Sequence, residues 1–322
     1  MKRLILGLAL VPALSVAETY KDEAVPPALQ ERVAKAEAAV AAGGQGPFKA
    51  AMISDPNLPT HTLYAPRDIK AATKRGKLPI IAWGNGACRN VGNRFSYFLT
   101  EIASHGYLVI AIGPVGPKIV EWHLNPEAEN PLPPAERLPN SYAAQLNDAI
   151  DWAIAENSRR GSPYFGKLDT KSIGVAGQSC GGLQAIAASA DKRVTTSMIW
   201  NSGTFAPGTR PLAGTGDATK ASLKRLHAPT AWISGDESDT AWKNSNADFE
   251  AVTDIPAFRA WAKGTGHSEV YREPMGGVYA PVAVGWFDWQ LKGSKTGRAM
   301  FMGPDCGLCK NPQWVVKQDK LR

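Results

Sequence analysis

The sequence has few histidines and cysteines, and it lacks both repeats and long apolar runs. Its 322 residues include only five histidines and four cysteines, and they show no internal repeat and no low-complexity linker. Beyond the N-terminus, no apolar run approaches the roughly 20 residues that cross a bilayer. These shortages exclude a repeat array and a transmembrane bundle. The 44% of hydrophobic residues can still form a sizeable core, in one large domain or two small ones.

The charges also lack a pattern. The net charge is +7, but the basic residues are scattered as pairs, for example at 74–75, 159–160 and 224–225. There is no basic stripe with interleaved aromatic residues of the kind that nucleic-acid-binding proteins present. We therefore expect a solvated surface and no nucleic-acid partner.

The N-terminus is typical of a secretory signal peptide, which we assign to residues 1–17. Lys2 and Arg3 precede an apolar run over residues 4–16, and small residues stand at the third-last and last positions, Ser15 and Ala17. The run is too short for a stable membrane anchor. We expect cleavage after Ala17 and export to the periplasm or the medium, where cysteines are oxidised.

The rest of the chain divides into three parts. Residues 18–45 form an N-terminal helical segment, because apolar residues recur at helical spacing over 24–42. Residues 46–299 alternate short apolar runs with helical stretches, and residues 300–322 form a C-terminal tail. Buried strands between helices are typical of an α/β fold with a mostly parallel, doubly wound sheet and helices on both faces.

The expected strands follow apolar runs and the expected helices follow amphipathic ones. We predict strands at 60–65, 78–83, 108–112, 172–176, 196–200, 230–234 and 258–262. We predict helices at about 93–105, 140–157, 180–190, 240–252 and 277–292. The long segment 113–139 breaks this rhythm, and a loop of that length in a compact domain is usually functional or mobile.

Ser179 is the predicted nucleophile. It stands in Gly-Gln-Ser-Cys-Gly at residues 177–181, directly after an apolar strand and before a helix, the context in which Gly-x-Ser-x-Gly marks a nucleophile turn. Both glycines are needed because the strand and the helix pass closely there. Cys180 is a weaker candidate, because Gln178 occupies the position where a cysteine nucleophile needs glycine.

The predicted base is His267 and the predicted acid is Asp239. In this type of fold the chain order is serine, acid, histidine, and His267 follows the last strand at the edge where open α/β sheets bind ligands. His123 is the alternative base, although it precedes the serine. The acid should follow the strand at 230–234, where Asp239 is preferred over Asp236.

The oxyanion donors and the cysteines are predicted together. The backbone N–H of Cys180 is one expected donor, and that of Ala87 is the other, with Gly86 as the alternative. Cys88 then lies beside Cys180. The two residues form either a disulfide or a pair of small buried thiols.

The remaining pair, Cys306 and Cys309, has no partner with which to complete a zinc site. A local disulfide that pins the C-terminal tail is the better interpretation. We predict no metal and no cofactor.

Three tryptophans follow strand ends near the predicted site. Trp122, Trp200 and Trp242 are candidates to line a substrate pocket, and the alternative is that they pack in the core. The sequence contains ten tryptophans, which is enough to place several there by core packing alone.

These motifs resemble the α/β-hydrolase superfamily over roughly residues 46–292. Gly-Pro-Phe at 46–48 and Thr-Leu-Tyr-Ala-Pro at 62–66 look like the start of the branch that holds dienelactone-hydrolase-like enzymes, bacterial cutinases and polyester hydrolases. The resemblance implies ester hydrolysis without a cofactor. Gln178, Cys180 and Ala87 replace the histidine, methionine and aromatic residue usual in polyester hydrolases, which counts against polymer degradation and leaves the triad intact.

The sequence thus predicts a secreted serine hydrolase that cleaves a small-molecule or polymeric ester. A peptidase or amidase on the same triad is the nearest alternative. A non-catalytic binding protein on a hydrolase scaffold and a thiol oxidoreductase using Cys306 and Cys309 are the others. No particular oligomeric state is predicted.

Overall fold

The fold was analysed in a computed structural model that describes residues 27–116, 141–209 and 211–321. The predicted signal peptide at 1–17 lies outside the described residues, as do Trp122 and His123. Within the described ranges, none of the helices has the length and apolar character needed to cross a membrane.

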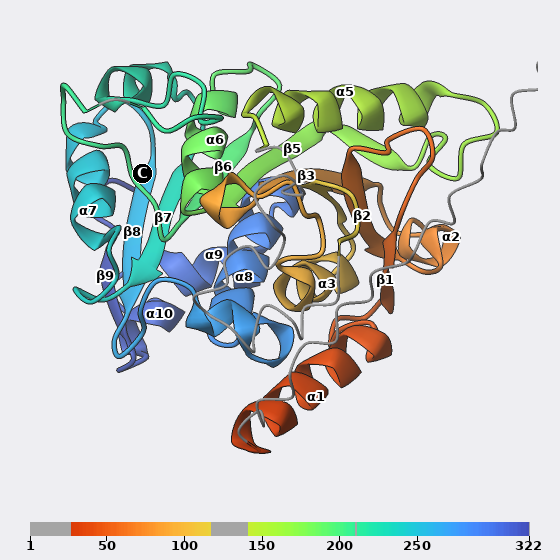
Figure 1. The fold of residues 1–322 in the computed structure, drawn as a ribbon, viewed down its shortest axis with the longest axis horizontal. Coiled ribbons are helices and arrows are strands. Elements are labelled where there is room, and N and C mark those ends of the chain that lie inside the picture. Colours follow the sequence, from red (N-terminus) through yellow and green to blue (C-terminus); the bar gives the residue numbers. More distant parts are fainter. Residues whose placement is uncertain (1–26, 117–140, 210, 322) are drawn as a thin grey trace, which may run out of the picture.

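One sheet organises the described chain (Figure 1). Its strands are β1 (Ala50–Ile53), β2 (His61–Pro66), β3 (Leu78–Gly84), β4 (Leu108–Ile112), β5 (Leu168–Gln178), β6 (Thr196–Trp200), β7 (Thr230–Gly235), β8 (Ala257–Ala262) and β9 (Trp314–Lys317). They lie in the order β1-β2-β4-β3-β5-β6-β7-β8-β9. Strands β3 to β8 pair in parallel, whereas β2 is antiparallel to both its neighbours and β9 is antiparallel to β8.

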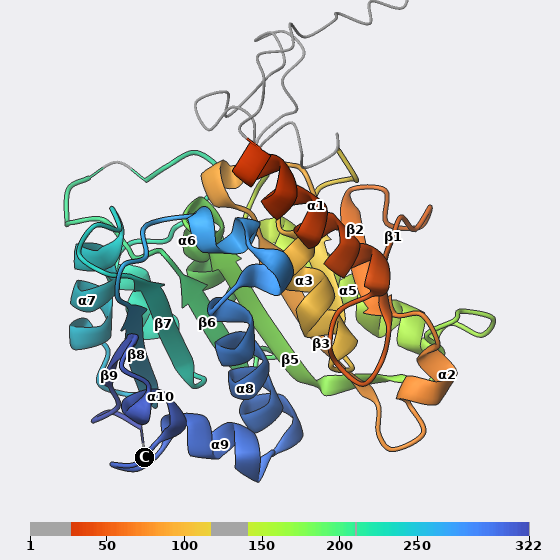
Figure 2. The ribbon, with the colours of Figure 1, turned by 90° about the horizontal axis from the view of Figure 1, so that it is seen from below.

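Helices cover both faces of this sheet. They are α1 (Pro27–Ala42), α2 (Ile69–Ala72), α3 (Ser96–Ser104), α5 (Ala144–Ser158), α6 (Cys180–Ala188), α7 (Trp242–Ala251), α8 (Tyr279–Lys292), α9 (Lys295–Phe301) and α10 (Gly307–Lys310). Helices α5 and α6 lie on one face, and α3 and α8 lie on the other (Figures 1 and 2). The predicted mostly parallel α/β architecture is confirmed.

The hydrophobic core consists of two layers, one on each face of the sheet. Successive residues of a strand point to opposite faces, so Ile80 belongs to the same core layer as Ile150 of α5, while Ile81 belongs to the layer of Leu99 and Phe287. This two-sided burial explains why the central strands read as continuous apolar runs in the sequence.

Part of the predicted C-terminal tail belongs to the sheet. Residues 314–317 of the predicted tail 300–322 form β9, which pairs with β8, and Trp314 is buried in the same core layer as α8. The strand β1 was also not predicted. Both are four-residue edge strands with partly exposed side chains, so neither gives a clear apolar run.

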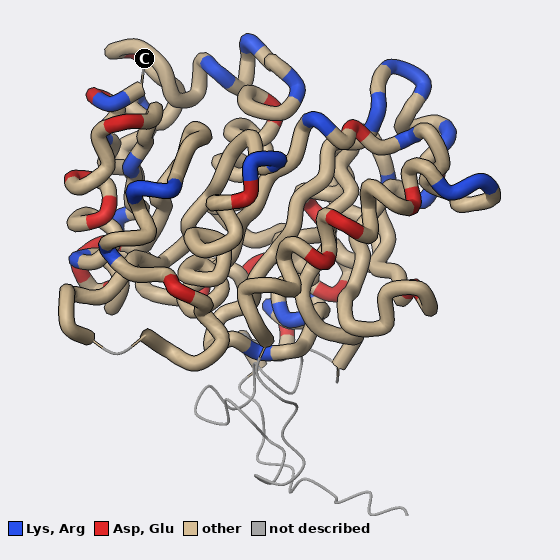
Figure 3. Tube along the Cα trace, turned by 90° about the horizontal axis from the view of Figure 1, so that it is seen from above, with Lys and Arg blue, Asp and Glu red and all other residues tan. Residues whose placement is uncertain are grey.

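The carboxyl ends of the parallel strands meet at one edge of the sheet, and three of the predicted site residues follow these ends. Ser179 follows β5, Asp239 follows β7 and His267 follows β8. Figure 3 shows Lys and Arg at many separate places on the described chain, with Asp and Glu among them.

Candidate active site

Ser179 lies in a strained turn between β5 and α6. Its backbone has φ 55° and ψ −119°, a conformation that costs a non-glycine residue about 1–3 kcal/mol. The turn is tight because a Cβ on Gly177 would lie 2.2 Å from the Gly181 carbonyl oxygen, and one on Gly181 would lie 2.1 Å from Gly84. The two glycines of the motif thus let the helix pass directly over the strand ends, and Ser179 as a residue stays partly exposed.

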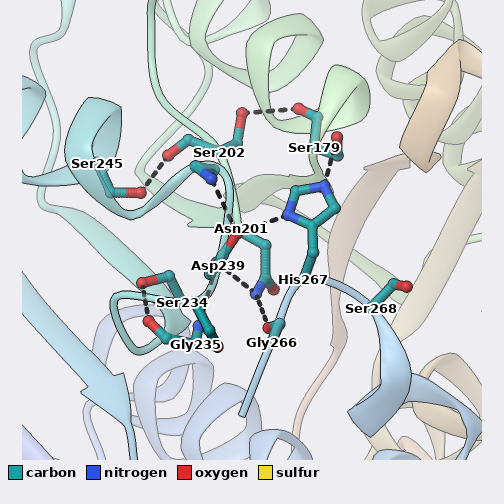
Figure 4. Close-up of polar contacts among 12 residues, drawn as sticks. Ser179, Asn201, Ser202, Ser234, Gly235, Asp239, Ser245, Gly266, His267 and Ser268 are labelled. Atoms are coloured by element: carbon teal, nitrogen blue, oxygen red, sulfur yellow. Dashed lines mark hydrogen bonds and ion pairs between the residues drawn. The ribbon is translucent and has the colours of Figure 1, made fainter.

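A continuous chain of hydrogen bonds joins the three predicted residues (Figure 4). Ser179 Oγ lies 2.9 Å from His267 Nε2, and His267 Nδ1 donates to Asp239 Oδ1 at 2.6 Å. The histidine side chain is 31% exposed, whereas that of Asp239 is fully buried. The series therefore runs from a buried carboxylate to the partly exposed His267 and Ser179.

The buried carboxylate of Asp239 is well supplied with donors. Besides His267, it accepts from the backbone N–H of Ala241 at 2.9 Å, from that of Gly235 at 3.2 Å and from Asn201 Nδ2 at 2.9 Å. These bonds offset the cost of removing the carboxylate from water. They also fix which oxygen faces His267.

Asp236 has a different place in the same turn. Its oxygens accept from the Ser238 hydroxyl and backbone and from the Gly264 N–H, and no hydrogen bond joins it to His267. Hydrogen bonds from Ser238 hold the pKa of Asp236 below its ordinary value. Of the two candidate acids, Asp239 is thus the one in contact with the histidine, and Asp236 shapes the turn.

The other described histidines have their own partners. His61 contacts the Gln145 carbonyl, His105 the Glu101 carboxylate and His227 the Val194 carbonyl. Burial lowers the pKa of His61, which favours its neutral form. Among the described histidines, only His267 is hydrogen-bonded to Ser179.

The disulfide between Cys88 and Cys180 is confirmed, with a Cα–Cα distance of 5.1 Å. It joins the short turn at Gly86–Cys88, after β3, to the first residue of α6. Ala87 and Cys88 both have positive φ angles, of 53° and 50°, which is unusual for residues with a Cβ. As the first residue of α6, Cys180 has a backbone N–H with no acceptor inside the helix.

The second predicted disulfide, between Cys306 and Cys309, is also confirmed and spans the start of α10. All four cysteines are therefore paired. In the part of the chain that the structure describes, no cluster of three or more His, Cys, Asp or Glu side chains has the arrangement of a metal site.

The structure does not support a pocket-lining position for Trp200. Its side chain is fully buried in the core, 5.3 Å from Phe98 and 5.2 Å from Tyr279 between ring centroids. As the last residue of β6, it points to the face that α3 and α8 cover, and a sequence position at a strand end does not reveal this direction. Trp242 is half-buried and packs edge-on against Trp261.

Several polar residues around the site were not predicted. Asn201, directly after β6, contacts Asp239, and the Ser202 hydroxyl donates to the Ser179 carbonyl at 2.6 Å. The Gln178 side chain donates to the His267 carbonyl at 3.0 Å. The available signal was their position, because each lies at or just after the end of a buried parallel strand.

No family model matches the chain, and no curated protein matches it either.

Proposed function

We propose that the chain is a serine hydrolase that cleaves carboxylic esters through a covalent acyl-enzyme. The observation that carries this proposal is the hydrogen-bonded series Ser179–His267–Asp239 at the carboxyl edge of a parallel sheet. A serine hydroxyl is a weak nucleophile unless a base takes its proton and an acid orients the base. All three groups are present, in the order and geometry that this chemistry requires.

In the first step, Ser179 Oγ attacks the ester carbonyl while His267 Nε2 takes the hydroxyl proton. The buried Asp239 holds the imidazole through Nδ1 and stabilises its charged form. His267 then gives the proton to the leaving alcohol as the ester C–O bond breaks. In the second step, a water molecule loses a proton to His267, attacks the acyl carbonyl and releases the acid, and Ser179 regains its proton.

The negative oxygen of each tetrahedral intermediate needs donors. The N–H of Cys180 has no acceptor within α6 and lies at the positive end of the helix dipole. The N–H of Ala87 belongs to the turn that the disulfide ties to that same helix end. We assign these two groups as the oxyanion donors, each worth about 10²- to 10³-fold in rate in enzymes of this kind.

The resemblance to α/β-hydrolases supports the same function. The nucleophile turn, the acid after β7 and the late histidine match the chain order of that superfamily. Gln178 takes part in hydrogen bonding where polyester hydrolases carry histidine, so a small-molecule ester is the favoured substrate over a polymer.

We also propose that the protein is exported. Two disulfides join all four cysteines, and such bonds persist in oxidising compartments. A leader at residues 1–17 would supply the route. N-terminal sequencing of the mature protein should begin at Glu18, and retention of Met1 would contradict the assignment.

The decisive experiment compares wild type with Ser179→Ala on p-nitrophenyl acetate and butyrate. We expect wild-type turnover with a burst of p-nitrophenol and a loss of about 10⁴-fold or more in the variant. Ser158→Ala is the matched control, because Ser158 is exposed at the end of α5 and its hydroxyl donates to the Ile154 carbonyl, so its activity should stay close to wild type.

A fluorophosphonate probe gives an independent result. It should label the wild type at Ser179 and leave Ser179→Ala unlabelled. Equal turnover by both proteins, or no label on the wild type, would overturn the proposal. Faster cleavage of p-nitroanilides than of matched esters would instead indicate an amidase.

A further inference from the structure

Two buried side-chain amides hold the segment that carries His267. Gln178 Nε2 donates to the backbone carbonyl of His267 at 3.0 Å, and Asn201 Nδ2 donates to that of Gly266 at 3.2 Å. Both amide-bearing residues are almost completely buried. Two consecutive carbonyls of the histidine segment are thus tied to the ends of the two neighbouring strands β5 and β6.

Asn201 also holds the acid. Its Nδ2 donates to Asp239 Oδ2 at 2.9 Å, on the side of the carboxylate opposite to the oxygen that meets His267 (Figure 4). One amide therefore connects the residue that orients the imidazole with the backbone from which the imidazole hangs.

The orientation of the Asn201 amide is itself fixed. The Tyr271 hydroxyl donates to Asn201 Oδ1 at 2.7 Å, so the NH₂ group is the one that faces Asp239. Burial raises the pKa of Tyr271 well above its ordinary value, which keeps this hydroxyl a donor at alkaline pH. The Asn201 backbone N–H donates to the Ile233 carbonyl of β7 at 2.7 Å, which anchors the residue to the strand that leads to Asp239.

The backbone at Asn201 is left-handed, with φ 42°. Asparagine and aspartate adopt this conformation more readily than other residues with a Cβ, and glycine adopts it without strain. The position therefore suits a short amide, and it also allows substitutions to Gly and Asp that remove the amide without straining the backbone.

Gln178 extends the arrangement toward the proposed oxyanion turn. Its Oε1 lies so close to Gly86 that a Cβ there would be 2.0 Å away. The side chain thus packs between the turn of Ala87 and the segment of His267, and it contacts both.

We propose that Asn201 and Gln178 are positioning residues, which hold His267 and Asp239 in the orientation needed for proton transfer from Ser179. This inference rests on the proposed hydrolase function. A misplacement of about 1 Å at a reacting group can cost as much as 10²-fold in rate, so the effect belongs in kcat and not in KM.

The test uses Asn201→Gly, Asn201→Asp and Gln178→Met, with kcat expressed per active site titrated by the fluorophosphonate probe. Asn201→Gly should lower kcat about 10- to 100-fold with KM within about threefold of wild type. Gln178→Met keeps the side-chain volume but removes the amide donor to the His267 carbonyl. It should lower kcat about tenfold, because this carbonyl is then no longer held.

Asn201→Asp replaces the donor by a carboxyl oxygen of the same shape. Two buried carboxyl groups this close share one proton, which takes part of the negative charge away from Asp239, so the acid limb of kcat/KM should move to lower pH. A purely structural role for Asn201 would lower stability and leave this limb where it is in the wild type.

Thr196→Val is the matched control. Thr196 is buried on the same strand, and its hydroxyl accepts from the Trp286 indole and donates to the Pro229 carbonyl, with no hydrogen bond to the site. Its loss should lower the melting temperature and leave the kcat per titrated site and the pH profile unchanged.

A second readout separates this inference from the proposed function. The His267 Nδ1 proton should give a downfield NMR signal in the wild type that weakens or disappears in Asn201→Gly, whether or not esters are turned over. Wild-type kcat per site in both Asn201→Gly and Gln178→Met, with the NMR signal retained, would overturn the inference. Ser179-dependent turnover in the wild type would still stand.

Discussion

One disulfide lies beside Ser179 and the other lies in the C-terminal region, and the two close loops of very different length. Cys88–Cys180 joins residues 92 positions apart and ties the turn after β3 to the helix that begins beside Ser179. Cys306–Cys309 joins residues three positions apart, at the start of α10, in the C-terminal region that ends in β9. In a chain-entropy model, the first contributes about 4–5 kcal/mol and the second only about 2 kcal/mol.

The difference shows that the same covalent bond serves two purposes here. Near Ser179 it holds two residues, Ala87 and Cys88, in a left-handed conformation that they would otherwise avoid. In the C-terminal region it shapes a local turn before an edge strand. We therefore expect changes near Ser179 to alter the chemistry, and changes in the C-terminal region to alter stability alone.

The largest contrast should come from replacing one carboxylate in each region. Asp239→Asn should lower kcat about 10³- to 10⁴-fold, because the amide no longer favours the required imidazole tautomer and charge. Asp305→Asn removes only an exposed pair with Lys310 and should leave kcat unchanged. Steady-state kinetics on p-nitrophenyl acetate measures both, and similar losses in the two variants would remove the distinction.

The paired disulfide variants come next. Cys88→Ala with Cys180→Ala should lower kcat about 10- to 100-fold, because the N–H of Ala87 is no longer held beside that of Cys180. Unfolding in urea should also show a loss of about 4–5 kcal/mol. Cys306→Ala with Cys309→Ala should cost about 2 kcal/mol and keep the kcat per titrated site. A catalytic loss in the second pair would favour a redox role for those cysteines.

Trp314→Ala tests whether core packing of the C-terminal region affects stability without affecting catalysis. This residue is 6% exposed and packs 6.0 Å from the Tyr279 ring. Its truncation should cost about 3 kcal/mol of unfolding free energy, in the range for buried aromatic residues. The kcat per titrated site should stay at the wild-type value below the unfolding transition, and a tenfold fall would mean that β9 supports the site directly.

The smallest expected difference between the two regions is in how the free energy of unfolding changes with pH above 10. Burial raises the pKa of Tyr271, near Asp239, well above 10, so the folded protein keeps a proton that the unfolded chain loses above about pH 10. Stability should therefore fall as pH rises above 10, and Tyr271→Phe should reduce this slope by up to about 1.4 kcal/mol per pH unit. The segment 295–322 contains no tyrosine, and Asp305→Asn alters only an exposed ion pair with Lys310, so that variant should keep the wild-type slope. An unchanged slope in Tyr271→Phe would contradict this account.

Much of the site could be predicted because its signals are local. The motif around Ser179 carries its own strand, turn and helix, and the chain order selected His267 and Asp239. For Trp200 the sequence left a pocket and the core as alternatives, because a strand end does not reveal which face a side chain meets. Asn201 was missed because a single asparagine after a strand carries no motif.

The amino-acid sequence by itself determined the alternation of apolar strands and helices, and the glycine pattern that makes the Ser179 turn possible. Only the tertiary structure decided that Asn201 reaches both Asp239 and Gly266, and that β9 completes the edge of the sheet. The reason is physical. Local patterns set backbone conformation over a few residues, whereas contacts between distant segments depend on strand order and on the face to which each side chain points.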